Sequence, residues 1–117
     1  MKKILLVDDE CFIHFLYRSI LGEKYNIESV TDPFEALEKI AKNQYSLIVV
    51  DINMPYINGL EIVKKVREKG CESKIIVVSS YGSGEKKSEA FSIGADDYLE
   101  KPIDNEEFIL KVEKWCV

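Results

Sequence analysis

Leu47-Ile48-Val49-Val50-Asp51 is the stretch that decides the fold, because a short apolar run rich in β-branched residues ends there on a carboxylate. Residues 4–7 and 75–78 form two further runs of the same kind. Strands that are apolar at every position are buried on both faces, which is typical of parallel sheets. Weaker strand patterns cover residues 26–30 and 97–99. The sequence therefore predicts five strands, with the three apolar runs inside a parallel sheet.

Segments with a helical period separate these strands. They cover residues 10–21, 33–42, 59–68, 85–93 and the chain from 104 onward. Asp32 is expected to cap the second helix, with Pro33 at its first position. Gly94 should end the fourth helix, and Asp104 with Glu107 resembles a capping box at the start of the fifth. The core face of the first helix is expected to carry Ile13, Leu16, Tyr17 and Ile20.

The alternation of strands and helices predicts one domain over residues 1–117 with (βα)5 order. Helical crossovers between parallel strands are right-handed, so the fold class is α/β, a doubly wound sheet with helices on both faces. In such sheets the functional cleft lies at the carboxyl ends of the strands, near the point where the strand order reverses.

The composition excludes several classes of function. The net charge is -5, which argues against direct binding of nucleic acid, because phosphate contacts need a basic patch. No apolar run approaches the ~20 residues of a membrane span, and the start lacks the features of a signal peptide. We therefore expect a cytoplasmic protein without membrane insertion. The three cysteines show no metal-binding spacing and are expected to be reduced thiols: Cys11, Cys71 and Cys116.

Polar residues stand where four of the predicted strands end. Asp8-Asp9 follow the first strand, Asp51 the third, Ser79 the fourth and Lys101 the fifth. Taken singly, each is more often a turn residue or an ordinary surface group. Together, three converging carboxylates repel one another unless a cation lies between them, and Mg²⁺ prefers such oxygen ligands. A lysine and a hydroxyl at the same edge would complete a site suited to phosphoryl transfer.

At these positions the chain resembles the receiver domains of bacterial two-component response regulators, and it does so along its whole length. The resemblance implies a flavodoxin-like sheet with strand order 2-1-3-4-5. The matching pieces are Leu6-Val7-Asp8-Asp9, Asp51-Ile52-Asn53-Met54-Pro55, Gly59, Val78-Ser79-Ser80, Gly94-Ala95-Asp96-Asp97-Tyr98 and Lys101-Pro102.

The resemblance also implies a role for each carboxylate. Asp51 would be the phosphoacceptor, taking a phosphoryl group from a phosphohistidine of a sensor histidine kinase or a His-phosphotransfer protein. Mg²⁺ would be bound directly by Asp9, Asp51 and the main-chain carbonyl of Asn53. Asp8 would support the metal through water.

Three further residues would respond to the modification. Lys101 would pair with Asp51 and then with its phosphoryl oxygens, and the peptide bond before Pro102 is expected to be cis. Ser79 would bind the phosphoryl group, and Tyr98 would rotate toward the space that Ser79 leaves. Such a change would alter contacts with a downstream protein target.

A few residues depart from the family pattern or suggest something else. Ser80 stands where Ala or Gly is typical, and Asn53 and Tyr81 lie where the family tunes dephosphorylation. Gly82-Ser83-Gly84 hints at a nucleotide loop but lacks the third glycine, so a simple loop is the preferred interpretation. His14, the single histidine, is interpreted as an ordinary surface residue.

The first helix also carries apolar residues away from its core face. Cys11 and Phe15 point outward and Phe12 flanks the core stripe, while Pro102 is expected nearby. An outer apolar patch often marks a docking site, although single exposed apolar residues are normal. In the family this helix meets the partner that carries the histidine, so these four residues are candidates for partner docking.

Three functions remain open from the sequence. The first is a signalling module that is not an enzyme, acting through protein contacts at the face of the fourth helix, fifth strand and fifth helix, near Tyr98. No sequence remains after the fifth helix for an effector domain, which favours a single-domain protein. The second is a Mg²⁺-dependent phosphatase with an aspartate nucleophile. Asn53 argues against it, because this residue occupies the position where such an enzyme needs a general acid. The third is a receiver fragment of a longer regulator.

Overall fold

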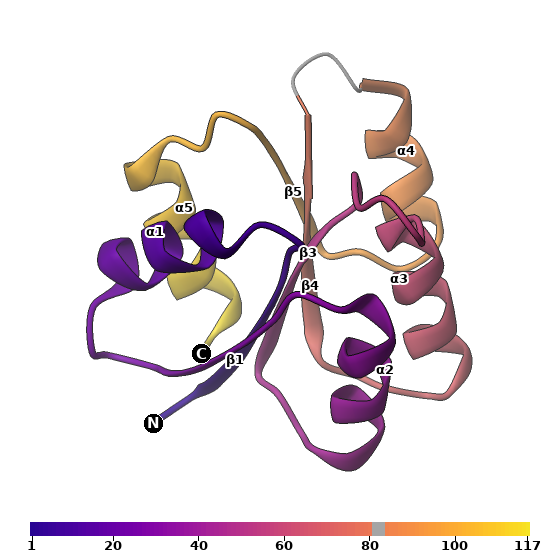
Figure 1. Ribbon diagram of the computed structural model, residues 1–117, viewed down its shortest axis with the longest axis horizontal. Coiled ribbons are helices and arrows are strands. Elements are labelled where there is room, and N and C mark those ends of the chain that lie inside the picture. Colours follow the sequence, from indigo (N-terminus) through magenta and orange to yellow (C-terminus); the bar gives the residue numbers. More distant parts are fainter. Residues whose placement is uncertain (81–83) are drawn as a thin grey trace.

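The computed structural model describes residues 1–80 and 84–117. Within them, strands and helices alternate as predicted (Figure 1). The strands are β1 (Lys3–Val7), β2 (Asn26–Val30), β3 (Leu47–Asp51), β4 (Lys74–Ser79) and β5 (Asp97–Glu100). The helices are α1 (Cys11–Leu21), α2 (Pro33–Lys42), α3 (Gly59–Glu68), α4 (Gly84–Ser92) and α5 (Asn105–Trp115). In the described part of the chain, no helix has the length and apolarity that a membrane crossing requires.

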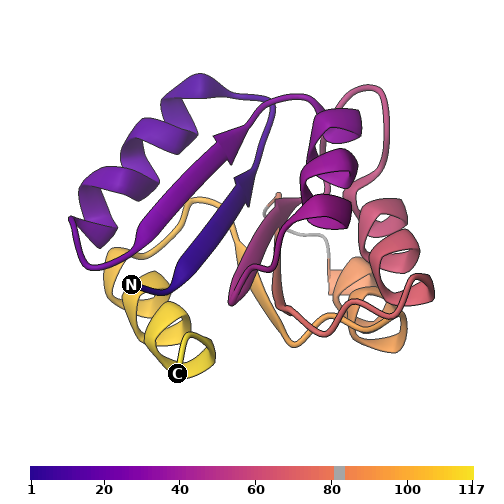
Figure 2. The same ribbon diagram turned by 90° about the horizontal axis from the view of Figure 1, so that it is seen from below.

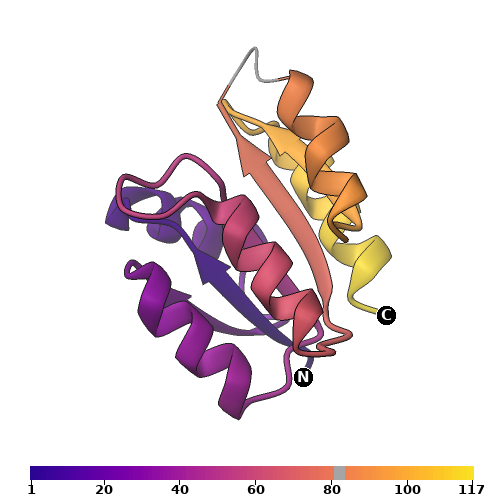
Figure 3. The same cartoon turned by 90° about the vertical axis from the view of Figure 1, so that its right-hand side faces the viewer.

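The five strands form one parallel sheet in the order β2-β1-β3-β4-β5, which confirms the predicted fold class and strand order. Helices α1 and α5 cover one face, and α2, α3 and α4 cover the other, as Figures 1 and 2 show. Figure 3 shows the three helices of the second face side by side in front of the sheet. Because β2 and β3 lie on opposite sides of β1, the strand order reverses between β1 and β3.

The central strands are buried on both faces, as their apolar runs predicted. Neighbouring residues of β1 contribute to different core clusters: Ile4 to the one with Tyr17 and Phe108, and Leu5 to the one with Ile62. The rings of Tyr17 and Phe108 stack with centroids 4.8 Å apart and join α1 to α5. The two layers of helices are therefore held by separate cores that share one sheet.

The helix ends follow the predicted capping residues. The side chain of Asp32 accepts a hydrogen bond from the Phe34 N–H at 2.9 Å, and Pro33 occupies the first turn of α2. Asp104 accepts from the N–H groups of the first turn of α5. After α4, Gly94 has a φ of 116°, a conformation in which a side chain would be strained. The predicted boundaries of the strands and helices agree with the observed ones to within one residue at each end, and those of β2, α2 and α3 are identical.

One prediction about α1 is wrong. His14 is not a surface residue but is 6% exposed, beside Tyr17 and Leu21 on the buried face. Tyr17 lies three residues further on, so both side chains share one side of the helix. The imidazole is tolerated there because its Nε2 bonds to the main-chain oxygen of Asp8. Ile13, Leu16 and Ile20 are only half-buried at the margin of this face.

Candidate functional site

Three carboxylates meet at the carboxyl ends of β1 and β3, where the strand order reverses. These two strands are neighbours, with Val7 opposite Val50, so Asp8 and Asp51 leave the sheet side by side. Asp8 and Asp51 are 1% and 3% exposed, whereas Asp9 is exposed. One oxygen from each carboxylate lies within 4.8 Å of the other two. The convergence predicted from the strand ends is therefore present.

Lys101 enters this cluster from the loop after β5. Its Nζ lies 3.2 Å from Oδ2 of Asp51 and 3.3 Å from Oδ2 of Asp8. Its main-chain N–H donates to the Ser79 carbonyl at 2.8 Å, which attaches the loop to β4. The peptide bond between Lys101 and Pro102 is cis, as expected. The ammonium group thus bridges the two buried acids.

The charges in the cluster shift the pKa values of two groups. Burial raises the pKa of Asp8, and repulsion by Asp51 adds to this, although the Glu10 N–H and Lys101 act in the opposite direction. Burial alone would lower the pKa of Lys101, but attraction to Asp51 and Asp8 outweighs it and raises that pKa. The ammonium group is therefore held in its charged form between the acids.

Asp51 is oriented by the chain that follows it. Its Oδ1 accepts a hydrogen bond from the Asn53 N–H at 2.9 Å, while Oδ2 faces Lys101. The side chain of Asn53 in turn accepts from the N–H and the hydroxyl of Ser80, at 2.8 and 3.1 Å. The hydroxyl that distinguishes Ser80 from the family's usual Ala or Gly is thus bonded to Asn53, a link that sequence reasoning missed.

Ser79 and Tyr98 lie on the neighbouring strands β4 and β5. Ser79 is fully buried, and its Oγ has no hydrogen-bond partner among the described residues. A buried hydroxyl in this state retains the capacity to bond a ligand oxygen. Tyr98 is 5% exposed and packs in the core under α2, α3 and α4, with Nζ of Lys87 5.9 Å from its ring centroid. The structure thus places Tyr98 inward.

The candidate docking residues are exposed near the same edge. Phe12 and Phe15 are 70% and 69% exposed on α1, and Cys11 and Pro102 are exposed as well. Sequence reasoning missed two further exposed aromatic side chains, Phe34 and Tyr56, which line a hollow with Asp9. Asp32 and neighbouring residues also line this hollow, which has a volume of about 440 Å³. The helical periodicity of the sequence could not identify Phe34 as a lining residue of this hollow, because periodicity does not show which loops lie next to the first turn of α2.

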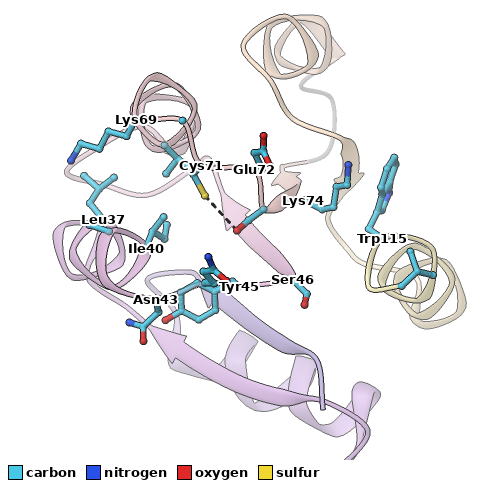
Figure 4. Close-up of a pocket in the computed structure, with 16 residues that line it drawn as sticks. Leu37, Ile40, Asn43, Tyr45, Ser46, Lys69, Cys71, Glu72, Lys74 and Trp115 are labelled. Atoms are coloured by element: carbon cyan, nitrogen blue, oxygen red, sulfur yellow. Dashed lines mark hydrogen bonds between the residues drawn. The ribbon is translucent and has the colours of Figure 1, made fainter.

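A second hollow lies at the opposite edge of the sheet, away from the acids. Its volume is about 720 Å³, and Figure 4 shows Tyr45, Cys71, Lys74 and Trp115 among its lining side chains. The Cys71 thiol donates to the hydroxyl of Ser73 at 3.4 Å. Since the residues before β3 and β4 line it, this hollow adjoins the amino ends of those strands and shares no residue with the acidic cluster.

Two minor predictions had different outcomes. The three cysteines are free, as expected: Cys11 is exposed, Cys71 half-buried and Cys116 buried. Tyr81 and the first two residues of Gly82-Ser83-Gly84 lie outside the described residues.

The acidic cluster fits a divalent cation. Three carboxylates and one ammonium group give the cluster a formal net charge of about -2, which a single Mg²⁺ would offset. The oxygen donors are of the type that Mg²⁺ prefers, and the exposed Asp9 leaves room for the waters that this ion keeps. The donor set is therefore consistent with magnesium.

Comparison with known proteins agrees with this geometry. Residues 4–113 match the family model described as "Response regulator receiver domain". Response regulator ArlR of Staphylococcus aureus is 35% identical over 113 residues, covering 96% of this chain and 51% of ArlR. The chain thus spans about half the length of these relatives.

Solved structures show the same fold. The receiver domain of the Francisella response regulator 1452 is 33% identical with a TM-score of 0.91, over 98% of this chain and 96% of that one. TrrA from Thermotoga maritima, solved in complex with Mg²⁺-BeF, is 36% identical with a TM-score of 0.87, over 98% and 99% of the two chains. With the family model matching nearly the whole sequence, the chain belongs to the response regulator receiver domain family.

Proposed function

We propose that this chain accepts a phosphoryl group on Asp51 from a phosphohistidine and thereby changes its contacts with a downstream protein. The donor would be a cytoplasmic sensor histidine kinase or His-phosphotransfer protein. The observation that carries the proposal is the bridge from Lys101 to Asp8 and Asp51, which places a buried carboxylate between a fixed cation and two further acids.

In the proposed transfer, an oxygen of Asp51 forms a bond to phosphorus while the bond from phosphorus to the imidazole nitrogen of the donor breaks. The imidazole keeps the electron pair of that bond. Lys101, already within 3.3 Å of both buried acids, would neutralise charge on the phosphoryl oxygens. Mg²⁺, held by Asp9, Asp51 and the Asn53 main-chain carbonyl, with Asp8 acting through water, would supply further charge neutralisation. The Mg²⁺-BeF complex of TrrA supports this choice of metal.

The modification would be transmitted through Ser79 and Tyr98. The buried hydroxyl of Ser79, which has no partner in residues 1–80 and 84–117, would bond to a phosphoryl oxygen, which would draw the end of β4 toward Asp51. Tyr98 lies on the adjacent strand, where Val77 is its register partner, so a shift of β4 would change its packing. The surface of α4, β5 and α5 would then meet the downstream partner.

The same site supports a signalling domain better than a phosphatase. Asn53 lies two residues after the acceptor, where such an enzyme needs a general acid, and an amide cannot fill that role. We therefore propose that the chain catalyses only its own phosphorylation and dephosphorylation. The output of a longer protein that contains this domain would come from its other segments.

The proposed function is tested by incubating the protein with acetyl phosphate, with and without Mg²⁺. We expect one phosphoryl group per chain, labile to hydroxylamine as an acyl phosphate, and strong loss of labelling when EDTA removes the metal. Intact-protein mass spectrometry measures both. Labelling that is unaffected by EDTA would contradict the metal assignment, and continuous release of phosphate from phosphomonoesters would favour the phosphatase.

The docking role of α1 leads to a separate prediction. Phe15→Glu places a charge on a 69% exposed side chain, so the fold should remain intact while an apolar contact is lost. We expect the rate of transfer from the phosphorylated kinase to fall roughly tenfold. This corresponds to the loss of about 1.4 kcal/mol of contact energy. Labelling by acetyl phosphate should be unchanged.

Leu110→Glu is the matched control, because Leu110 is 66% exposed on α5, outside the proposed docking surface. It should leave the rate of transfer from the kinase as it is. Equal losses for Phe15→Glu with both phosphodonors would show that the substitution damages the site itself, which would remove the case for docking through α1.

A further inference from the structure

His14 contacts the backbone of the acidic cluster but is not one of its charged residues. The side chain leaves the second turn of α1 toward the sheet and is 6% exposed. Its Nε2 lies 2.7 Å from the main-chain oxygen of Asp8. A carbonyl oxygen can only accept, so the imidazole donates this hydrogen bond. The other ring nitrogen, Nδ1, is buried and has no partner among the described residues.

This bond acts on the backbone just after β1 ends. The N–H of Asp8 still donates to the Val30 carbonyl at 3.2 Å, and its Oδ1 accepts from the Glu10 N–H at 3.0 Å. The carbonyl of Asp8 belongs to the next peptide unit, which it shares with the nitrogen of Asp9. Because a peptide unit is planar, holding that oxygen also fixes the direction in which the chain enters Asp9.

Asp9 needs such a constraint more than its neighbours do. Asp8 and Asp51 are buried and bonded to Lys101, so several contacts position their carboxylates. Asp9 is exposed and lies beyond the end of β1, outside the strand ladder. The position of its carboxylate therefore depends on the backbone that carries it, and His14 is a side chain of the next helix that holds this backbone.

We propose that His14 is a positioning residue for the metal site, which orients the peptide between Asp8 and Asp9 so that the Asp9 carboxylate faces Asp51. This inference rests on the proposed function, since it assumes that Mg²⁺ binds at the three acids. Groups that orient the ligands of a metal commonly change its affinity by one to two orders of magnitude when they are removed. The imidazole acts through the main chain, so the lower end of that range applies.

The test is a calorimetric titration of the full chain with MgCl₂, with no phosphodonor present. His14→Leu introduces an apolar, helix-compatible side chain that cannot donate a hydrogen bond, and we expect it to weaken Mg²⁺ binding about tenfold. His14→Gln places an amide donor near the same position and should recover most of the affinity. In NMR spectra without metal, the amide resonance of Asp9 should shift in the Leu variant and return toward its wild-type position in the Gln variant.

Tyr17→Phe is the matched control. It removes another buried polar atom from the same face of α1, one turn further on, that has no hydrogen-bond partner among the described residues, and it leaves the bond between His14 and Asp8 in place. Its Mg²⁺ affinity should equal that of the wild type. Urea unfolding of each variant separates a lost site from a lost fold, and where His14→Leu does not fold, His14→Met takes its place.

The outcomes are distinct. Wild-type affinity in His14→Leu, or a loss that Tyr17→Phe shares, would overturn the positioning role and leave the proposed function intact. A tenfold loss that His14→Gln does not recover would also overturn it, because the imidazole would then matter for its shape and not as a donor. Absence of Mg²⁺ binding in the wild type would overturn the proposed function and this inference together.

Discussion

Asp51→Asn should abolish labelling by acetyl phosphate while leaving the fold intact. An amide oxygen or nitrogen is a poor nucleophile because its electrons are delocalised, so the bond to phosphorus cannot form at this position. The shape of the side chain is nearly unchanged, and its Oδ1 can still accept from the Asn53 N–H. Intact-protein mass spectrometry and circular dichroism measure the two properties on the same sample.

The variant should also be at least as stable as the wild type without metal. Removing one negative charge relieves the repulsion that Asp51 exerts on Asp8, which contributes to the raised pKa of Asp8. The substitution also removes the ion pair between Asp51 and Lys101, which lowers the stability. Lys101 keeps its contact with Asp8 at 3.3 Å, which limits this loss. Thermal unfolding in the presence of EDTA tests this balance.

Asp32→Asn is the control for this substitution. Asp32 is an exposed acid that lines the hollow beside Asp9, and its side chain caps α2. Asparagine caps a helix about as well as aspartate, so the fold should be unaffected. We expect full labelling of this variant. Undiminished labelling of Asp51→Asn would instead show that another residue is the acceptor, and peptide mapping would identify it.

The parts of the fold that could be predicted from sequence are those in which each strand or helix carries its own signal. The apolar run that ends at Asp51 shows burial on both faces, and burial on both faces implies helices on both sides of the sheet. Parallel strands then bring their carboxyl ends to one edge. The convergence of Asp8, Asp9 and Asp51 follows from that geometry. The order of the strands in the sheet could be predicted only from the family resemblance.

Contacts made by long side chains to distant main-chain groups could not be predicted. Arg67 donates to the carbonyls of Gly94, Cys71 and Ser73 at 2.7 to 3.0 Å and pairs with Asp96, which joins α3 to the chain on both sides of β4. Its acceptors are carbonyls, which every residue has, so no sequence pattern distinguishes them.

The burial of His14 could not be predicted from the sequence either. No sequence pattern indicates that a single polar residue beside an apolar stripe is buried. The partner that makes the burial of His14 tolerable is the main-chain oxygen of Asp8. Residue types identify the groups that carry charge or bond to a ligand. They do not identify the groups that hold the backbone in place around them, because that depends on the packing of α1 against β1.

Gly59→Ala should weaken both the fold and the site. A Cβ built at Gly59 would lie 2.5 Å from the main-chain oxygen of Asp51 and 2.7 Å from the Cα of Ile52. Both atoms belong to the backbone, so neither can rotate away as a flexible side chain would. Either α3 or the end of β3 must move, and overpacking of this kind costs about 3 kcal/mol of unfolding free energy. Because the displaced segment carries Asp51, labelling by acetyl phosphate should slow as well.

Gly70→Ala separates this steric effect from the ordinary cost of replacing a glycine. Gly70 follows α3 with a φ of 81°, and a Cβ there would meet no atom within 4 Å. Its replacement should cost about 1 kcal/mol through backbone strain alone, with an unchanged labelling rate. Urea unfolding gives the two free energies. If Gly59→Ala costs no more than Gly70→Ala, α3 can move away from Asp51 freely, and the close approach of the two segments does not fix the position of the acceptor.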